Sequence, residues 1–179
     1  MKKHFFLTVL AIILLFTSSV SAKQSAPVQI KNVGEQTVLL LKGTSTRETI
    51  GPDMGAMFGK VYAYMSGAGI QPAGPPLSLY YTEPGPQWKI AVAVPVAKET
   101  GTPKASEPIQ LITLAGGKMA SAMHMGPYKK LGGAWNTFSQ WVKSNGYYPA
   151  GPAREIYLVG PEKQPDPAKY QTQLLLPVH

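Results

Sequence analysis

A glutamate and a tyrosine stand two residues apart in a short segment, Arg154-Glu155-Ile156-Tyr157-Leu158. Alternate residues of a β-strand share a face, so as a strand this segment places Glu155 and Tyr157 side by side. A carboxylate on a packing face is costly to bury without a partner, which makes Glu155 the best candidate for a functional residue. It could serve as counter-ion to an organic cation or, with a tyrosine in reach, as a general base toward water. An exposed glutamate on an edge strand would fit the same pattern.

Aromatic side chains that could line a site with Glu155 occur in both halves of the chain. A tyrosine or tryptophan face contributes about 0.5–2 kcal/mol to the binding of a cation. Two of the candidates, Phe58 and Trp135, also belong to apolar helical stripes, where packing in the core is the alternative role. The candidate ligand-binding residues are Glu155, Tyr157, Trp135, Tyr128, Tyr147, Phe58 and Trp88.

Two helices and several strands are expected to position these residues. Prolines at Pro52 and Pro127 can begin helices, and Gly69 and Gly146 follow the last apolar residue of each. Apolar residues recur at helical spacing in Met54, Phe58, Val61 and Met65 and again in Leu131, Trp135, Phe138 and Val142. Segments typical of strands lie at about 36–42, 77–82, 88–96, 109–115, 118–125, 154–159 and 170–178. The sequence therefore predicts an α+β fold.

The chain repeats itself at a constant shift of 77 residues. This shift maps one stripe onto the other, and it places Gly69, Pro72, Gly74 and Tyr80 on Gly146, Pro149, Gly151 and Tyr157. We therefore expect a duplicated strand-helix-strand-strand unit, with copies at 36–96 and 109–178 joined by a polar linker at 97–108. Two such copies would pack about a pseudo-twofold axis, and the cleft between them is a preferred place for a ligand. Only the second copy carries the acid, since Ser78 is the counterpart of Glu155.

The first 22 residues have the pattern of a signal peptide. Lys2 and Lys3 precede a short apolar run, and Val20-Ser21-Ala22 supplies the small residues of a cleavage site. We expect cleavage after Ala22, a loose lead-in at 23–35, and a single domain at 36–178 in a periplasmic or secreted protein. The run is short for a membrane span, so we expect no transmembrane segment after cleavage, although an uncleaved anchor is the alternative. The chain has no cysteine, which excludes a lipid-anchored lipoprotein.

Charge and composition argue against several classes of function. Without Lys2 and Lys3, the 17 basic residues become fifteen against nine acidic ones, and the net charge falls from +8 to +6. The basic residues are scattered, which predicts a weak attraction to anionic envelope surfaces and no nucleic-acid partner. His124 is the one histidine inside the expected domain, so zinc lacks ligands; methionine-bound copper is a weaker hypothesis than adaptable packing. We find no phosphate loop, nucleophile elbow or dinucleotide fingerprint, and we expect no cofactor and no metal.

Taken together, the motifs of the second half resemble the GyrI-like small-molecule-binding domain, which is also the effector-binding domain of multidrug-responsive and AraC-type regulators similar to Rob. The resemblance covers nearly the whole expected mature chain, with a weaker first-half copy ending in Val94-Pro95-Val96. The motifs are Met125-Gly126-Pro127-Tyr128, Leu131, Ala134-Trp135, Trp141, Gly146-Tyr147, Gly151-Pro152, Glu155-Ile156-Tyr157 and Leu176-Pro177-Val178.

The resemblance implies a duplicated fold that holds lipophilic, often cationic, small molecules between its copies, with Glu155 as the counter-ion and aromatic side chains around it. It also implies an alternative, because some similar stand-alone proteins hydrolyse reactive electrophiles with the acid and neighbouring aromatics. A third hypothesis is an interaction protein of the cell envelope. The chain departs from the regulators in its export signal and in having no segment left for a DNA-binding domain, so transcriptional control and gyrase inhibition are not expected.

Overall fold

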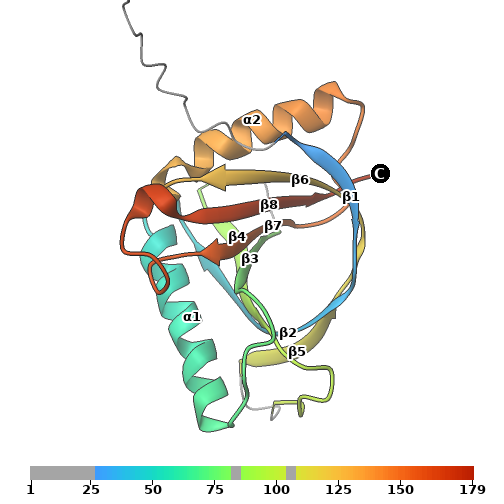
Figure 1. Ribbon diagram of the computed structural model, residues 1–179. Coiled ribbons are helices and arrows are strands. Elements are labelled where there is room, and N and C mark those ends of the chain that lie inside the picture. The colour runs from blue at the N-terminus through green and yellow to red at the C-terminus, as the bar shows by residue number, and fades with distance from the viewer. Residues whose placement is uncertain (1–26, 82–85, 104–107) are drawn as a thin grey trace, which may run out of the picture.

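The computed structural model describes residues 27–81, 86–103 and 108–179; the expected signal peptide at 1–22 lies outside them. The described part contains eight β-strands, two α-helices and two short 3-10 turns (Figure 1). The strands are β1 (Gln29–Val33), β2 (Gln36–Ser45), β3 (Leu77–Tyr80), β4 (Trp88–Pro95), β5 (Ile109–Leu114), β6 (Gly117–Met125), β7 (Ala153–Val159) and β8 (Gln171–Pro177). The helices are α1 (Ile50–Gly67) and α2 (Leu131–Ser144). The α+β class is confirmed.

All eight strands form one antiparallel sheet in the order β1-β6-β8-β7-β3-β4-β2-β5. The central pair is β7 and β3, whose register places Ser78 opposite Glu155. On either side of this pair the order is the same when read outward, because β8 and β6 follow β7 as β4 and β2 follow β3. The candidate glutamate therefore lies at the centre of the sheet.

Both helices lie on the outer side of the curved sheet (Figure 1). The β2 segment shows why, because its alternate residues separate onto two apolar faces. Leu39 and Leu41 pack under α1 with the stripe that ends at Met65, while Val38 and Leu40 belong to a cluster on the inner face. A third cluster lies under α2 around Phe138. The predicted helical stripes thus face the sheet.

The two helices end in the same way. Gly69 and Gly146 adopt positive φ angles of 67° and 77°, a conformation that side chains with a Cβ rarely adopt. After each glycine the next amide turns back onto the helix, as Ile70 N donates to Met65 O at 2.9 Å and Tyr147 N to Val142 O at 3.1 Å. These matching bonds obey the 77-residue shift. An origin of the two halves by duplication stays a prediction.

Two expectations about the chain's ends and linker need correction. The lead-in at 23–35 is not loose throughout, because Gln29–Val33 forms β1 and pairs with β6. The strand at 109–114, β5, was expected to belong to the second copy, but it pairs with β2 of the first copy. The second strand-helix-strand-strand series therefore begins at β6. Residues 104–107 of the expected linker lie outside the described part.

Each edge strand pairs with the opposite half of the chain, β1 with β6 and β5 with β2. The β1–β2 and β5–β6 connections cross closely where this happens. A Cβ added to Gly116, between β5 and β6, would lie 2.3 Å from the Val33 carbonyl oxygen and 2.7 Å from the Glu35 amide. Only glycine allows this approach of the two backbones. The crossing brings the β1–β2 connection and the β5–β6 connection together at one side of the sheet.

Candidate functional site

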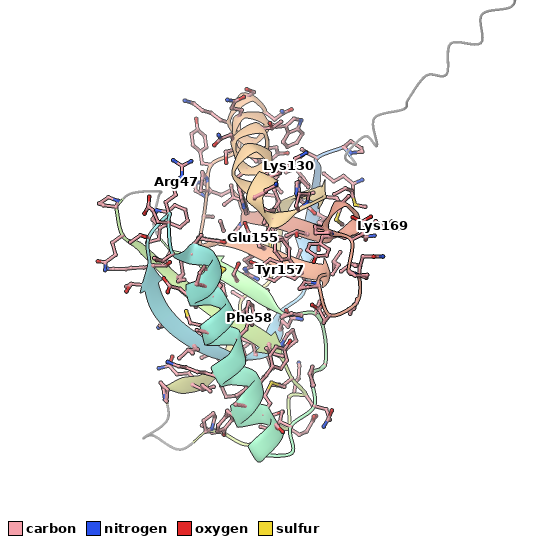
Figure 2. The ribbon with its side chains drawn as sticks, turned by 90° about the vertical axis from the view of Figure 1, so that its left-hand side faces the viewer. Arg47, Phe58, Lys130, Glu155, Tyr157 and Lys169 are labelled. Carbon is pink, nitrogen blue, oxygen red and sulfur yellow. The ribbon has the colours of Figure 1, made fainter. Side chains whose placement is uncertain are left out.

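Glu155 lies on β7 with its side chain on the helix-covered face, between Tyr157 of the same strand and Ser78 of β3. Only 3% of it is exposed. Figure 2 shows Glu155 and Tyr157 close together, with Phe58 of α1 beside them. The predicted sharing of one face by Glu155 and Tyr157 is therefore what the structure shows, and the alternative of an exposed edge-strand glutamate is wrong.

Three neutral donors hold the carboxylate. The Trp135 indole Nε1 donates to Oε1 at 2.6 Å, from α2. The hydroxyls of Tyr80 and Tyr157 both donate to Oε2, at 2.9 Å and 2.8 Å. An ionised carboxylate only accepts hydrogen bonds, so it suits a cage built of three donors. No residue in the described ranges forms an ion pair with Glu155.

The two tyrosines belong to a larger buried network. The hydroxyls of Ser78 and Tyr157 lie 2.9 Å apart. The single hydroxyl proton of Tyr157 is donated to Glu155, so the Ser78 hydroxyl must donate to the Tyr157 oxygen. The chain of hydrogen bonds therefore ends at the carboxylate. The Met54 sulfur of α1 lies 3.7 Å from the Tyr157 hydroxyl and 3.9 Å from that of Tyr80. Both helices and both central strands thus contribute to the site.

The environment keeps these tyrosines protonated. Burial, and after it the charge of Glu155, raises the pKa of Tyr80 and of Tyr157 far above the ordinary value. Burial, followed by the charge of Glu162, raises the pKa of Tyr128 to about 12. All three hydroxyls are therefore donors near neutral pH, and none of them can act as a base there.

Most of the predicted aromatic residues surround this network. The ring of Phe58 meets that of Tyr157 edge to face at a centroid distance of 6.0 Å. Tyr128 meets the same ring at 5.4 Å and is itself 37% exposed. Trp135 and Phe58 are half-buried, so they take part in the site and in the core at once.

Two predicted residues are placed differently. Trp88 packs on Tyr80, with ring centroids 6.3 Å apart, and its buried indole nitrogen has no hydrogen-bond partner in the described part. The Tyr147 ring stacks on Trp141 at 6.5 Å, with the Lys118 ammonium 5.5 Å from its centroid. The structure therefore brings Tyr147 to the far end of α2 and not to Glu155.

Three further residues belong to the site although their sequence pattern did not predict it: Tyr80, Met54 and Tyr170. Tyr170 packs on Tyr128 with ring centroids 5.1 Å apart. Tyr80 could have been found, because the 77-residue shift maps it onto Tyr157 and the shift also pairs Ser78 with Glu155. His124, in contrast, contacts the Pro127 carbonyl oxygen at 3.3 Å and has a structural role.

Packed rings cover Glu155, and a ligand cleft beside it stays a prediction. The cavities described in the structure lie elsewhere. One of about 290 Å³ lies at the β2–β5 edge, and one of about 300 Å³ lies on the inner face of the sheet beside Arg154.

Among residues 27–81, 86–103 and 108–179, no three histidine or acidic side chains gather to hold a metal ion. No helix in these ranges is long and apolar enough to cross a membrane.

The fold is thus a curved antiparallel sheet with two helices on its outer side, and donors from the sheet and from α2 surround one buried carboxylate. A model of the GyrI-like small molecule binding domain matches residues 26–179. The chain therefore belongs to the GyrI-like family, and the predicted resemblance is confirmed. No curated protein matches the chain.

Solved structures with low sequence identity share the fold. In a cryo-EM structure of an EcmrR–DNA complex, EcmrR is 20% identical over 86% of this chain, with a TM-score of 0.76, and the match spans 57% of EcmrR. SAV2435 bound to tetraphenylphosphonium is 19% identical over 86% of this chain and 94% of its own, with a TM-score of 0.57. A hydrolase encoded by lin2189 from Listeria innocua is 17% identical over 85% of this chain and 91% of its own, with a TM-score of 0.60.

Proposed function

We propose that this chain binds a lipophilic organic cation in the region that the aromatic rings now fill, with Glu155 as the counter-ion. One observation carries the proposal. Glu155 is buried, is held by three neutral donors, and has no cationic partner among the described residues. A buried charge without an opposite charge is unfavourable, and a ligand cation would supply the missing partner.

The surroundings of Glu155 favour a large, weakly hydrated cation. At an effective dielectric constant of 20, opposite charges 4 Å apart attract by about 4 kcal/mol, against about 1 kcal/mol in water. The faces of Trp135, Tyr128 and Tyr157 would add cation–π contacts of about 0.5–2 kcal/mol each. A tetraarylphosphonium ion meets both requirements, and the fold neighbour SAV2435 is described as bound to one.

Binding requires the rings over Glu155 to move apart. Tyr128 is the most exposed of them, and it joins β6 to α2, so its rotation would open the cage with little disturbance of the sheet. The separation of the rings uses some of the binding energy. We expect affinities in the micromolar range, about −8 kcal/mol, as a result.

The test removes the charge and keeps the shape. Glu155→Gln should weaken tetraphenylphosphonium binding by about 10- to 150-fold, since a hydrogen bond or contact to a charged group contributes about 1.5–3 kcal/mol. Binding of neutral triphenylphosphine oxide should change much less. Glu99→Gln, at an exposed position, is the matched control. Isothermal titration measures all of these affinities, and equal affinity of the Glu155→Gln variant and the wild type for the phosphonium would refute the proposal.

Hydrolysis of a reactive electrophile is the second candidate function. Two tyrosine hydroxyls on one carboxylate oxygen could donate to a leaving group while Glu155 activates water. However, the two tyrosine bonds occupy both lone-pair sites of Oε2, and Trp135 occupies one on Oε1, which leaves a single site for a water molecule and favours binding. Loss of hydrolysis with retained binding in Glu155→Gln would reverse this preference. If neither activity depends on Glu155, an interaction protein of the envelope remains.

We also propose, separately, that the protein is exported across the cytoplasmic membrane. The support for export is the charged, apolar and small-residue pattern of residues 1–22, which ends in Val20-Ser21-Ala22. N-terminal sequencing of protein recovered from the producing cells should begin at Lys23. Recovery of chains that retain residues 1–22 would contradict the export proposal and leave the binding proposal intact.

A further inference from the structure

A cavity of about 300 Å³ lies on the inner face of the sheet, opposite to the face that carries Glu155. Strand alternation separates the two sites, because Arg154 and Ile156 point inward where Glu155 and Tyr157 point outward. Apolar walls come from Leu77 of β3, Ile156 of β7 and Leu175 of β8. The volume is at the lower end of the range for small-molecule pockets, about 300–1,000 Å³.

Arg154 gives this cavity a buried cation. Arg154 as a whole is 7% exposed, and its Nη2 donates to the Ala115 carbonyl oxygen at 2.8 Å. Its Nε is buried and has no hydrogen-bond partner among the described residues. No acidic side chain of the described part forms an ion pair with Arg154. Burial also lowers the pKa of Arg154. The Nε–H group therefore lacks an acceptor, and the guanidinium as a whole lacks a counter-ion among the described residues, which is costly in a folded protein.

The other charges around the cavity leave it positive. Lys31 of β1 lines it and has no ion pair in the described ranges. The one acidic residue of the lining, Glu35, pairs with Lys98 at 3.2 Å. Gly34 and Glu35 are exposed, so the rim at the β1–β2 connection is open to solvent. An anion can thus enter the cavity from this side.

We propose that the inner cavity is a second binding site, which takes a small monocarboxylate with an apolar tail. The carboxylate would accept from Arg154 Nε with Lys31 nearby, and the tail would lie against Leu77, Ile156 and Leu175. A guanidinium group matches a carboxylate in geometry as well as in charge. The inference is independent of the proposed cation site, because it concerns the opposite face and the opposite charge.

Octanoate is a suitable probe, with octanol as its neutral counterpart and octylammonium as its cationic one. We expect the purified protein to bind octanoate at least tenfold more tightly than either, measured by isothermal titration. Arg154→Gln should weaken octanoate binding at least tenfold, while Lys42→Gln, at an exposed position on β2, should leave it within twofold. Glu155→Gln should also leave octanoate binding unchanged, so failure at one site is distinguishable from failure at the other.

A measurement on the wild type keeps the test decisive if Arg154→Gln does not fold. The Nε–H group of a buried arginine gives its own signal in a ¹⁵N-resolved NMR spectrum. Saturating octanoate should shift the Arg154 signal, and octanol should not. Equal binding of the three eight-carbon probes, or an Arg154 Nε–H signal that octanoate leaves in place, would overturn the proposal.

Discussion

The hydrogen bond from Tyr80 to Glu155 permits a quantitative test of the caged carboxylate. Tyr80→Phe removes a hydroxyl that donates at 2.9 Å and keeps the ring that packs on Trp88. A hydrogen bond to a charged group contributes about 1.5–3 kcal/mol, and one between neutral groups about 0.5–1.5 kcal/mol. We therefore expect Tyr80→Phe to lower the free energy of unfolding by about 1.5–3 kcal/mol.

The same substitution in a Glu155→Gln background separates charge from packing. If the cost arises from the carboxylate, it should fall to about 0.5–1.5 kcal/mol there, which gives a coupling energy of about 1 kcal/mol or more in a double-mutant cycle. Tyr157→Phe should cost more than Tyr80→Phe in the wild-type background, because it also leaves the buried Ser78 hydroxyl without its partner at 2.9 Å. Urea unfolding followed by tryptophan fluorescence measures each value.

An exposed tyrosine supplies the control for these measurements. Tyr148 is 64% exposed, so Tyr148→Phe should change stability by less than about 0.5 kcal/mol. Equal costs of Tyr80→Phe in the two backgrounds would show that the hydroxyl does not act through the charge of Glu155. The counter-ion argument would then lose its structural basis.

Three further outcomes follow from the same structure. Stability should fall as pH rises from about 10, because tyrosines of the unfolded chain lose their protons there while Tyr80 of the folded protein stays protonated. Urea titrations at alkaline pH should show a smaller fall for Tyr80→Phe. Gly69→Ala and Gly146→Ala should each lower the free energy of unfolding by about 1–2 kcal/mol, because alanine is strained at a positive φ angle. Gly132→Ala should raise it by about 0.5–1 kcal/mol, because Gly132 is a helical residue of α2 with free space around the added Cβ. The reverse order would contradict the capping role of Gly69 and Gly146. Gly116→Ala should cost about 3 kcal/mol or more, because its Cβ would meet backbone atoms that cannot move aside, and a near-native melting temperature would show that the two connections can separate.

The sequence predicted those parts of the fold that depend on local pattern. The stripes around Phe58 and Phe138 predicted both helices, although α1 begins at Ile50, two residues before the expected Pro52. The sequence could not predict which strands the two edge strands pair with, because the short segments of β1 and β5 carry no signal for their partners. That choice depends on the close crossing at Gly116, which only the folded backbone reveals.

The site was predictable where two residues share a strand and less so where it is assembled from distant elements. Glu155 and Tyr157 follow from alternation alone. Tyr147 was expected at the site because it is aromatic and near in sequence, but the left-handed turn at Gly146 directs the chain toward Lys118. The role of Arg154 could not be predicted from the sequence, since an arginine on the opposite face of the strand carries no sign of burial until the curvature of the sheet is known.

The register of the central strands explains why only one half of the chain carries the acid. The 77-residue shift maps Ser78 onto Glu155, and these two residues are also direct partners across β3 and β7. Their neighbours obey the same rule, because the pair Leu77–Ile156 corresponds to the pair Arg154–Leu79. Directly opposite residues have Cβ atoms about 4.5–5.5 Å apart, so an acid in both copies would place two buried carboxylates against each other. A frame with this register can hold one buried charge at its centre, and the small hydroxyl of Ser78 then serves the network of the other half.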